Sequence, residues 1–305
     1  MPESATTASS ATSEESTAAP KVAVKPGRAT NPMTRAVIAV LAILATLVFF
    51  FPLYWAISTS LRSPADTFTV TGVGVPFLQF KPTLDNFITE LSTPEGLKAL
   101  WTSIIVSSFA TGLALVLGIP AAYALARFRF FSNADITIWF LSQRALPPVA
   151  TLLPFYLIFR EFGLLDTKLA LILVNATFIL PFVVVIVRQT FLDLPVELEE
   201  AALVDGASHF RAFFLVALPL AMPAIAATAL IIFSFAWNEF LFAISFGITE
   251  TKTMPAHMAG AVDTRGVQFW FMATRALIAM VPPVILALFA QRYIVQGLTL
   301  GAVKG

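Results

Sequence analysis

The chain has 305 residues, of which 58% are hydrophobic and 12% are charged. Soluble domains carry roughly 25% charged residues, so the composition excludes a soluble globular fold and indicates a membrane protein. The formal net charge of +1 argues against a nucleic-acid partner, and the absence of cysteine excludes disulfides and thiolate chemistry. With only two histidines, His209 and His257, we expect no metal site and no catalytic site.

Residues 1–32 are rich in Ala, Ser, Thr, Glu and Pro, and we expect them to form a disordered tail. Residues 33–305 contain apolar runs that are continuous and do not alternate with polar residues, which favours helices over barrel strands. The sequence therefore predicts an all-α polytopic membrane domain. Six transmembrane helices are expected at about 36–58, 101–126, 136–160, 169–188, 220–247 and 271–291.

The distribution of Lys and Arg outside these spans predicts the orientation of the chain. Ten of them lie in the N-terminal tail, the second and fourth loops and the C-terminal tail (about 292–305), against seven in the other loops. Because positive residues favour the cytoplasmic side, we expect both termini to be cytoplasmic. The segment 62–98 would then be an external loop, and its prolines and glycines suggest short helices.

The fourth loop, about 189–219, contains a predicted helix–turn–helix elbow. Pro195 and the three carboxylates that follow it favour a helix start, and Gly206 favours its end. Ser208 can cap a second helix, on which Phe210, Phe213, Phe214 and Ala217 are expected to share one face. On physical grounds alone, an amphipathic helix at the membrane surface is the favoured explanation of this loop.

The spacing within this loop carries a more specific signal. Glu200, Ala201 and Ala202 are followed by Gly206 after three residues, and by Val216 and Leu218-Pro219 further on. This pattern resembles the EAA motif of bacterial ABC importer permeases, with Val216 where the motif usually has isoleucine.

Other segments extend the resemblance over roughly residues 35–305, and they are similar to the shorter permease of the maltose type. They are Arg144 to Pro148, Gly163 to Thr167, Trp237 to Phe240, and the C-terminal run from Gln296 to Gly305.

The resemblance implies a type I ABC importer permease fold, in a carbohydrate importer of the bacterial inner membrane. It also implies a second permease subunit, two ATP-binding cassette subunits, an external solute-binding protein and contact with membrane lipid. ATP and magnesium would be bound by the partner subunits, since no glycine of this chain is followed by lysine and a phosphate-binding loop is therefore impossible. The coupling residues implied are Glu200, Ala201, Ala202, Asp205, Gly206, Ala207, Leu218 and Pro219. The C-terminal residues implied to contact the ATPase are Gly297, Thr299, Gly301 and Lys304.

Polar residues inside the predicted spans are candidates for the substrate path. A charged group near mid-bilayer is costly, so Arg144 and Glu239 should face protein or water and not lipid. Sugars are commonly held by amide, carboxylate and guanidinium groups beside aromatic rings. The candidates are Arg144, Asn175, Trp237, Asn238 and Glu239. The alternative is that Asn238 and Glu239 serve helix packing or contact the second permease.

Three other functions compete with this interpretation. An ion-coupled secondary transporter would have no reason to carry the EAA loop. An ABC permease for a non-sugar solute is disfavoured by the segment from Gly297 to Gly305. An intramembrane enzyme lacks a metal set and a nucleophile–base pair. The sequence does not identify which sugar or polyol is carried.

Overall fold

The computed structural model describes residues 31–70, 72–129, 131–263 and 266–302. Except for its last two residues, the predicted disordered tail lies outside the described residues. The chain divides into two units, Met1–Phe50 and Phe51–Gly305. The first unit contains the beginning of α1, whose apolar side chains from Val37 to Phe50 are largely exposed.

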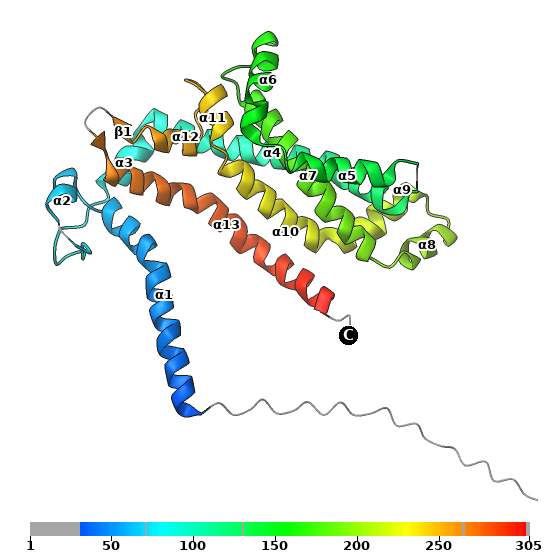
Figure 1. Cartoon of the computed structure of the whole chain (residues 1–305), viewed down its shortest axis with the longest axis horizontal. Helices are drawn as coiled ribbons and strands as arrows, with labels where there is room; N and C mark the ends of the chain where they lie inside the picture. Colours follow the sequence, from blue (N-terminus) through cyan, green and yellow to red (C-terminus); the bar gives the residue numbers. More distant parts are fainter. Residues whose placement is uncertain (1–30, 71, 130, 264–265, 303–305) are drawn as a thin grey trace, which may run out of the picture. The chain divides into compact units, whose positions relative to one another are not determined.

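The chain is built from helices with a single two-stranded antiparallel hairpin among the described residues (Figure 1). The elements up to the third apolar segment are α1 (Pro32–Ser60), α2 (Pro64–Thr69), α3 (Asp85–Ser92), α4 (Pro94–Arg127), α5 (Asn133–Gln143) and α6 (Pro148–Glu161). They are followed by α7 (Lys168–Asp193), α8 (Glu197–Val204), α9 (His209–Ala212), the π-helical turn η1 (Phe213–Ala217) and α10 (Leu218–Trp237). The last elements are α11 (Leu241–Phe246), α12 (Met254–Ala259), β1 (Val262–Asp263), β2 (Gly266–Val267) and α13 (Phe269–Ala302).

Five of the six predicted spans are confirmed as long helices. Among the described residues, five helical segments are long and apolar enough to cross a membrane, namely α1, α4, α7, the segment from α9 through α10, and α13. Within the predicted loop 62–98, α2 and α3 are the expected short helices.

The prediction of one continuous helix at 136–160 is wrong. This segment forms two helices, α5 and α6, with a break from Arg144 to Pro147. Pro147 and Pro148 have no N–H to donate, and a proline also disfavours the helical conformation of the residue before it. The helix therefore ends before this proline pair, and a new helix begins at Pro148.

Two further predicted boundaries differ in the structure. The fifth span was expected to run to residue 247, but α10 ends at Trp237 and α11 follows after a three-residue break. At the C-terminus, α13 continues past the expected end of the sixth span as far as Ala302, so the predicted tail begins as helix. Gly297, Thr299 and Gly301 are part of this helix, and Lys304 lies outside the described residues.

The core of the second unit lies where α4 packs on α7 and α10. Small residues on α4, including Ala110 and Ala114, are fully buried there, and they let the helices approach closely. The helices are also close at Gly118, where an added Cβ would lie 2.7 Å from Cγ1 of Val183 on α7. This packing makes α4, α7 and α10 the platform to which the shorter elements attach.

Candidate functional site

The predicted elbow is present at one end of the second unit (Figure 1). α8 ends two residues before Gly206, which has a φ of +86°, a left-handed conformation that favours glycine. The N–H of Ala207 donates to the carbonyl of Ala202 (3.0 Å) and closes the end of α8. The Ser208 hydroxyl accepts a hydrogen bond from the N–H of Arg211 (3.3 Å) at the start of α9. The glycine turn and the serine cap are both confirmed.

Most residues predicted to contact an ATPase lie on the outer surface of this elbow. The exposed ones are Glu200, Ala201, Asp205, Gly206 and Pro219, and the half-buried ones are Ala202, Ala207 and Leu218. Glu200 forms no ion pair with any residue that the structure describes. Its carboxylate is therefore available to a partner, while Leu218 packs toward the apolar core.

The four aromatic and apolar residues expected on one face after Ser208 do not share an environment. Phe213 and Ala217 are buried, whereas the side chains of Phe210 and Phe214 are 72% and 45% exposed. The prediction assumed a regular helix, but η1 is a π-helical turn, which changes the angular spacing along the chain. Phe213 packs on the ring of Tyr123 in α4, with 4.6 Å between the ring centroids.

Glu199 is the residue of this loop that the sequence analysis did not single out. It is buried, and its Oε2 accepts a hydrogen bond from the Tyr123 hydroxyl at 2.6 Å. Its Oε1 lies 2.7 Å from both Nε and Nη2 of Arg127, the last residue of α4. Nη2 of Arg127 also donates to the carbonyl of Leu194, just after α7 (3.2 Å). The ends of α4 and α7 and the first turn of α8 therefore meet at one ion pair.

A signal for this contact exists in the sequence, although it is faint. Tyr123 and Arg127 are four residues apart, so on a helix they share a face at the end of the second predicted span. A donor pair of this kind requires an acceptor, and Glu197, Glu199 and Glu200 are all near enough in the fourth loop to be candidates. Only the packing of α8 against α4 selects Glu199.

Three of the five residues predicted for the substrate path line one cavity. Arg144, Asn175 and Glu239 line a space of about 540 Å³ together with several phenylalanines. The Arg144 guanidinium lies 4.3 Å from the ring centroid of Phe182, in a cation–π contact. Asn175 is buried on α7 and donates to the carbonyl of Leu171. The cavity thus combines guanidinium, amide and carboxylate groups with aromatic rings.

The other two predicted path residues belong to a different cavity. Trp237 and Asn238 line a space of about 460 Å³ beside α12 and α13. Trp237 is buried and its Nε1 donates to the carbonyl of Ala279 on α13 (3.1 Å). The Asn238 amide donates to the carbonyl of Ser234, one turn back in α10 (2.8 Å). The tryptophan therefore has a packing role between α10 and α13.

Glu239 also has a structural role within its cavity. Its Oε1 accepts a hydrogen bond from the N–H of Phe242 (2.7 Å), and its Oε2 accepts one from the N–H of Ala243 (3.1 Å). These N–H groups are at the start of α11, where a carboxylate satisfies otherwise unpaired donors. The carboxylate that was predicted for the substrate path thus holds the break between α10 and α11 in place.

The family of the chain follows from its similarity to a family profile and to known proteins. The profile of the family described as binding-protein-dependent transport system inner membrane component matches residues 114–300. The chain is 34% identical over 268 residues to the trehalose/maltose transport system permease protein MalG of Thermococcus litoralis, covering 87% of this chain and 95% of that protein. The chain belongs to this permease family.

A second relative supports this assignment, and a solved structure has a similar fold. The permease is 36% identical over 272 residues to the trehalose transport system permease protein SugB of Mycobacterium tuberculosis, covering 87% of this chain and 97% of that protein. Its fold is similar to a chain in the crystal structure of a bacterial ABC transporter involved in the import of the acidic polysaccharide alginate. The TM-score is 0.72 at 21% identity, over 86% of the permease and 96% of that chain.

At the end of the second unit opposite the elbow, the permease has a second buried carboxylate (Figure 1). Glu90 on α3 accepts from the His257 ring at 2.5 Å and from Nε of Arg275 at 2.9 Å. Burial raises the pKa of Glu90, but the hydrogen bonds and charges of His257 and Arg275 outweigh it and hold the pKa below its usual value. The cluster joins α3 to α12 and α13.

Asp166, between α6 and α7, holds the loop after α11. Its carboxylate accepts hydrogen bonds from the backbone N–H groups of Thr249, Glu250 and Thr251, at 2.9 to 3.1 Å. The Thr251 hydroxyl donates to it as well (2.9 Å). Burial raises the pKa of Asp166, and these hydrogen bonds lower it to a value below the usual range. The residue is part of the Gly163 to Thr167 segment that carried the family resemblance.

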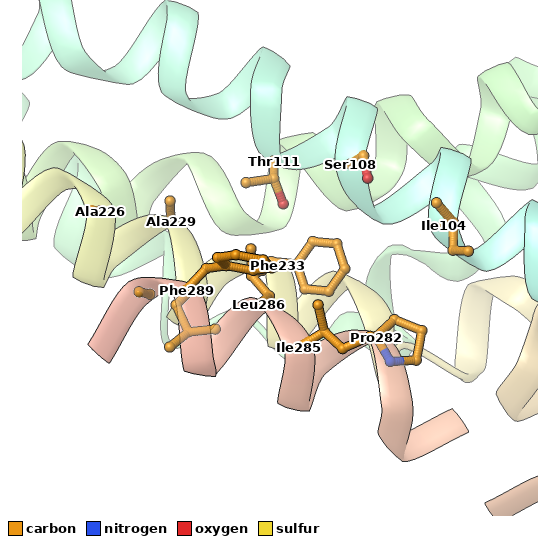
Figure 2. Close-up of a pocket in the computed structure, with 12 residues that line it drawn as sticks. Ile104, Ser108, Thr111, Ala226, Ala229, Phe233, Pro282, Ile285, Leu286 and Phe289 are labelled. Atoms are coloured by element: carbon orange, nitrogen blue, oxygen red, sulfur yellow. The ribbon is translucent and has the colours of Figure 1, made fainter. Parts of the chain in front are cut away.

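A third cavity, the largest of the three considered, lies between α4, α10 and α13, and the sequence did not predict it (Figure 2). It measures about 630 Å³ and its walls are mostly apolar. Ser108 and Thr111 on α4 are its polar residues, and Figure 2 shows Thr111 across the space from Phe289 on α13. Among the described residues, no cluster of three or more His, Asp or Glu side chains could hold a metal ion.

Proposed function

We propose that this permease is a transmembrane subunit of an ABC importer for a carbohydrate. The observation that carries the proposal is the elbow of α8 and α9, which presents Glu200, Ala201 and Gly206 outward while Glu199 holds it to α4. A short helix with small residues and exposed carboxylates suits a groove on an ATPase subunit. Membership of a binding-protein-dependent transport family supports the same assignment.

A carbohydrate is the proposed substrate class for two reasons. The relatives include permeases whose names specify trehalose/maltose and trehalose. The cavity of Arg144, Asn175 and Glu239 offers polar groups beside phenylalanine rings, which suits hydroxyl groups and the apolar faces of a sugar ring. Since the carboxylate of Glu239 caps α11, Arg144 and Asn175 are the stronger candidates for direct contact.

The proposal includes the rest of the assembly. A second permease subunit completes the path, two ATP-binding cassette subunits bind ATP and magnesium, and an external solute-binding protein delivers the sugar. In this arrangement the elbow and both termini are cytoplasmic, and the Glu90 cluster lies on the external side of the membrane. The C-terminal part of α13 and Lys304 contact the ATPase pair. In a bacterial cell the complex resides in the inner membrane, in contact with lipid.

Reconstituted transport tests the proposal. The permease is co-purified with its partner subunits, placed in proteoliposomes, and supplied with its binding protein and radiolabelled trehalose, maltose, monosaccharides or polyols. Uptake of at least one carbohydrate should require ATP and the binding protein, and the permease alone should show no ATPase activity. Uptake by the permease alone, driven by a proton or sodium gradient, would overturn the proposal in favour of a secondary transporter.

The Arg144 cavity has its own test in the same assay. Arg144→Met should lower carbohydrate uptake about tenfold, as expected for the loss of a charged hydrogen-bond donor, with the assembled complex still purified in normal yield. Asn238→Ala, which affects the other cavity, is the matched comparison and should have the smaller effect on uptake. The reverse order would remove the Arg144 cavity from the substrate path.

A further inference from the structure

α8 is a short helix with a largely exposed surface, so its attachments decide how far a displacement of α8 is transmitted. Chain continuity joins it to α7 on one side and to α9 on the other. A third attachment is the ion pair of Glu199 with Arg127, whose side chains are 8% and 11% exposed. Within the part of the chain that the structure describes, no other ion pair joins α8 to a long helix.

The geometry of this pair makes it resistant to separation. Both carboxylate oxygens of Glu199 are used, one by Tyr123 and the other by Arg127. If α8 moved away from α4, the buried carboxylate of Glu199 would lose its partners and the guanidinium of Arg127 would lose its counter-ion, which is strongly unfavourable. The second contact of Arg127, to the carbonyl of Leu194, includes the end of α7 in the same unit. A displacement of α8 therefore displaces the ends of α4 and α7.

We infer that Glu199 is a positioning residue for energy coupling, which makes α8 move as one body with α4 and α7. The inference rests on the proposed function. Glu199 and Glu200 are adjacent, and on a helix they point about 100° apart, one toward α4 and the other outward. The outward carboxylate serves contact with the ATPase. The inward one transmits the resulting movement to α7, which carries Asn175, and to the α4 wall of the largest cavity.

The test compares sugar molecules taken up per ATP hydrolysed, in proteoliposomes containing the complete complex. Glu199→Gln should lower this ratio about tenfold while ATP hydrolysis continues, because the ion pair with Arg127 is lost and its hydrogen bonds are weakened. Arg127→Gln should have the same effect, and the double variant should be no worse than either single one. Glu197→Gln, on the exposed side of the same helix, is the control and should keep the wild-type ratio.

Assembly is measured for each variant by co-purification of the partner subunits. If Glu199→Gln fails to assemble, Tyr123→Phe is the deciding variant, because it removes the hydroxyl that donates to Glu199 and leaves the ion pair intact. Tyr123→Phe should lower the ratio about threefold, as expected for the loss of one hydrogen bond. A wild-type ratio in an assembled Glu199→Gln complex, or in Tyr123→Phe when the former does not assemble, would overturn the inference. Absence of ATP-driven uptake by the wild-type complex would instead overturn the proposed function.

Discussion

Two buried carboxylates stabilise opposite ends of the permease, and they differ in what they connect. Glu199 takes both of its side-chain donors from one helix, α4, and so attaches the short helix α8 directly to the end of that helix. Glu90 takes its donors from α12 and α13, far away in the sequence, and so joins three elements into one body. The first arrangement allows the exposed helix α8 to move together with α4. The second makes an end of the molecule rigid.

The largest effect is expected from removing the charge of Glu90. Glu90→Gln leaves the Arg275 guanidinium buried without its carboxylate, and losing one partner of a buried pair costs about 3 to 5 kcal/mol. We expect a lower midpoint of thermal unfolding for the purified complex. The decrease should be larger than for Glu199→Gln, because the side-chain donors to Glu199 all come from one helix, whereas those to Glu90 come from two. An equal or smaller decrease for Glu90→Gln would show that the two ends do not differ in rigidity.

Acid should weaken the same end of the molecule. The pKa of Glu90 is lowered in the folded permease from its usual value of 4.5, so the unfolded state binds more protons in the range between the two values. The contribution of Glu90 to stability is therefore complete above pH 4.5 and is lost as the pH falls through the folded-state pKa. The difference in unfolding midpoint between wild type and Glu90→Gln should shrink over this acidic range. A difference independent of pH would contradict the ionised state of Glu90.

A change in the core that both ends share should have an intermediate effect. Any side chain at Gly118 meets Val183, and overpacking of this kind typically costs about 1 to 3 kcal/mol, so Gly118→Val should lower the unfolding midpoint. Gly112→Ala on the same helix is the matched control, because an added Cβ there has no atom within 4 Å. It should leave the midpoint unchanged or raise it. A tolerated Gly118→Val would mean that α4 and α7 can separate.

The two ends also differ in how far the sequence predicts them. The turn at Gly206 and the cap at Ser208 depend on residues within the same loop, and both were predicted. The pairing of Glu199 with α4 spans 72 residues, and that of Glu90 with Arg275 spans 185. Such contacts depend on how distant helices pack, which local patterns do not specify.

The substrate-path candidates illustrate the same limit. Trp237, Asn238 and Glu239 are neighbours in the sequence, so they were treated as one cluster. The end of α10 at Trp237 turns the chain, and the three residues line two different cavities. The break at Pro147 and Pro148 is a similar case, because its extent depends on whether the surrounding helices accommodate two separate pieces.

The smallest effects are expected near the loop after α11, where a half-buried and an exposed contact can be compared directly. Asp166→Asn weakens hydrogen bonds to three backbone N–H groups, and the loss of charge should cost about 1 to 2 kcal/mol. The matched control is Lys98→Met, which removes the ion pair with Glu250; its side chains are 48% and 68% exposed. Exposed pairs contribute at most about 1 kcal/mol and often nothing measurable, so Lys98→Met should leave the unfolding midpoint almost unchanged.

Hydrogen exchange of residues 247–253 provides a local measurement, with faster exchange expected in Asp166→Asn and wild-type rates in Lys98→Met. Faster exchange in Lys98→Met alone would show that the exposed ion pair, and not the Asp166 carboxylate, holds this loop.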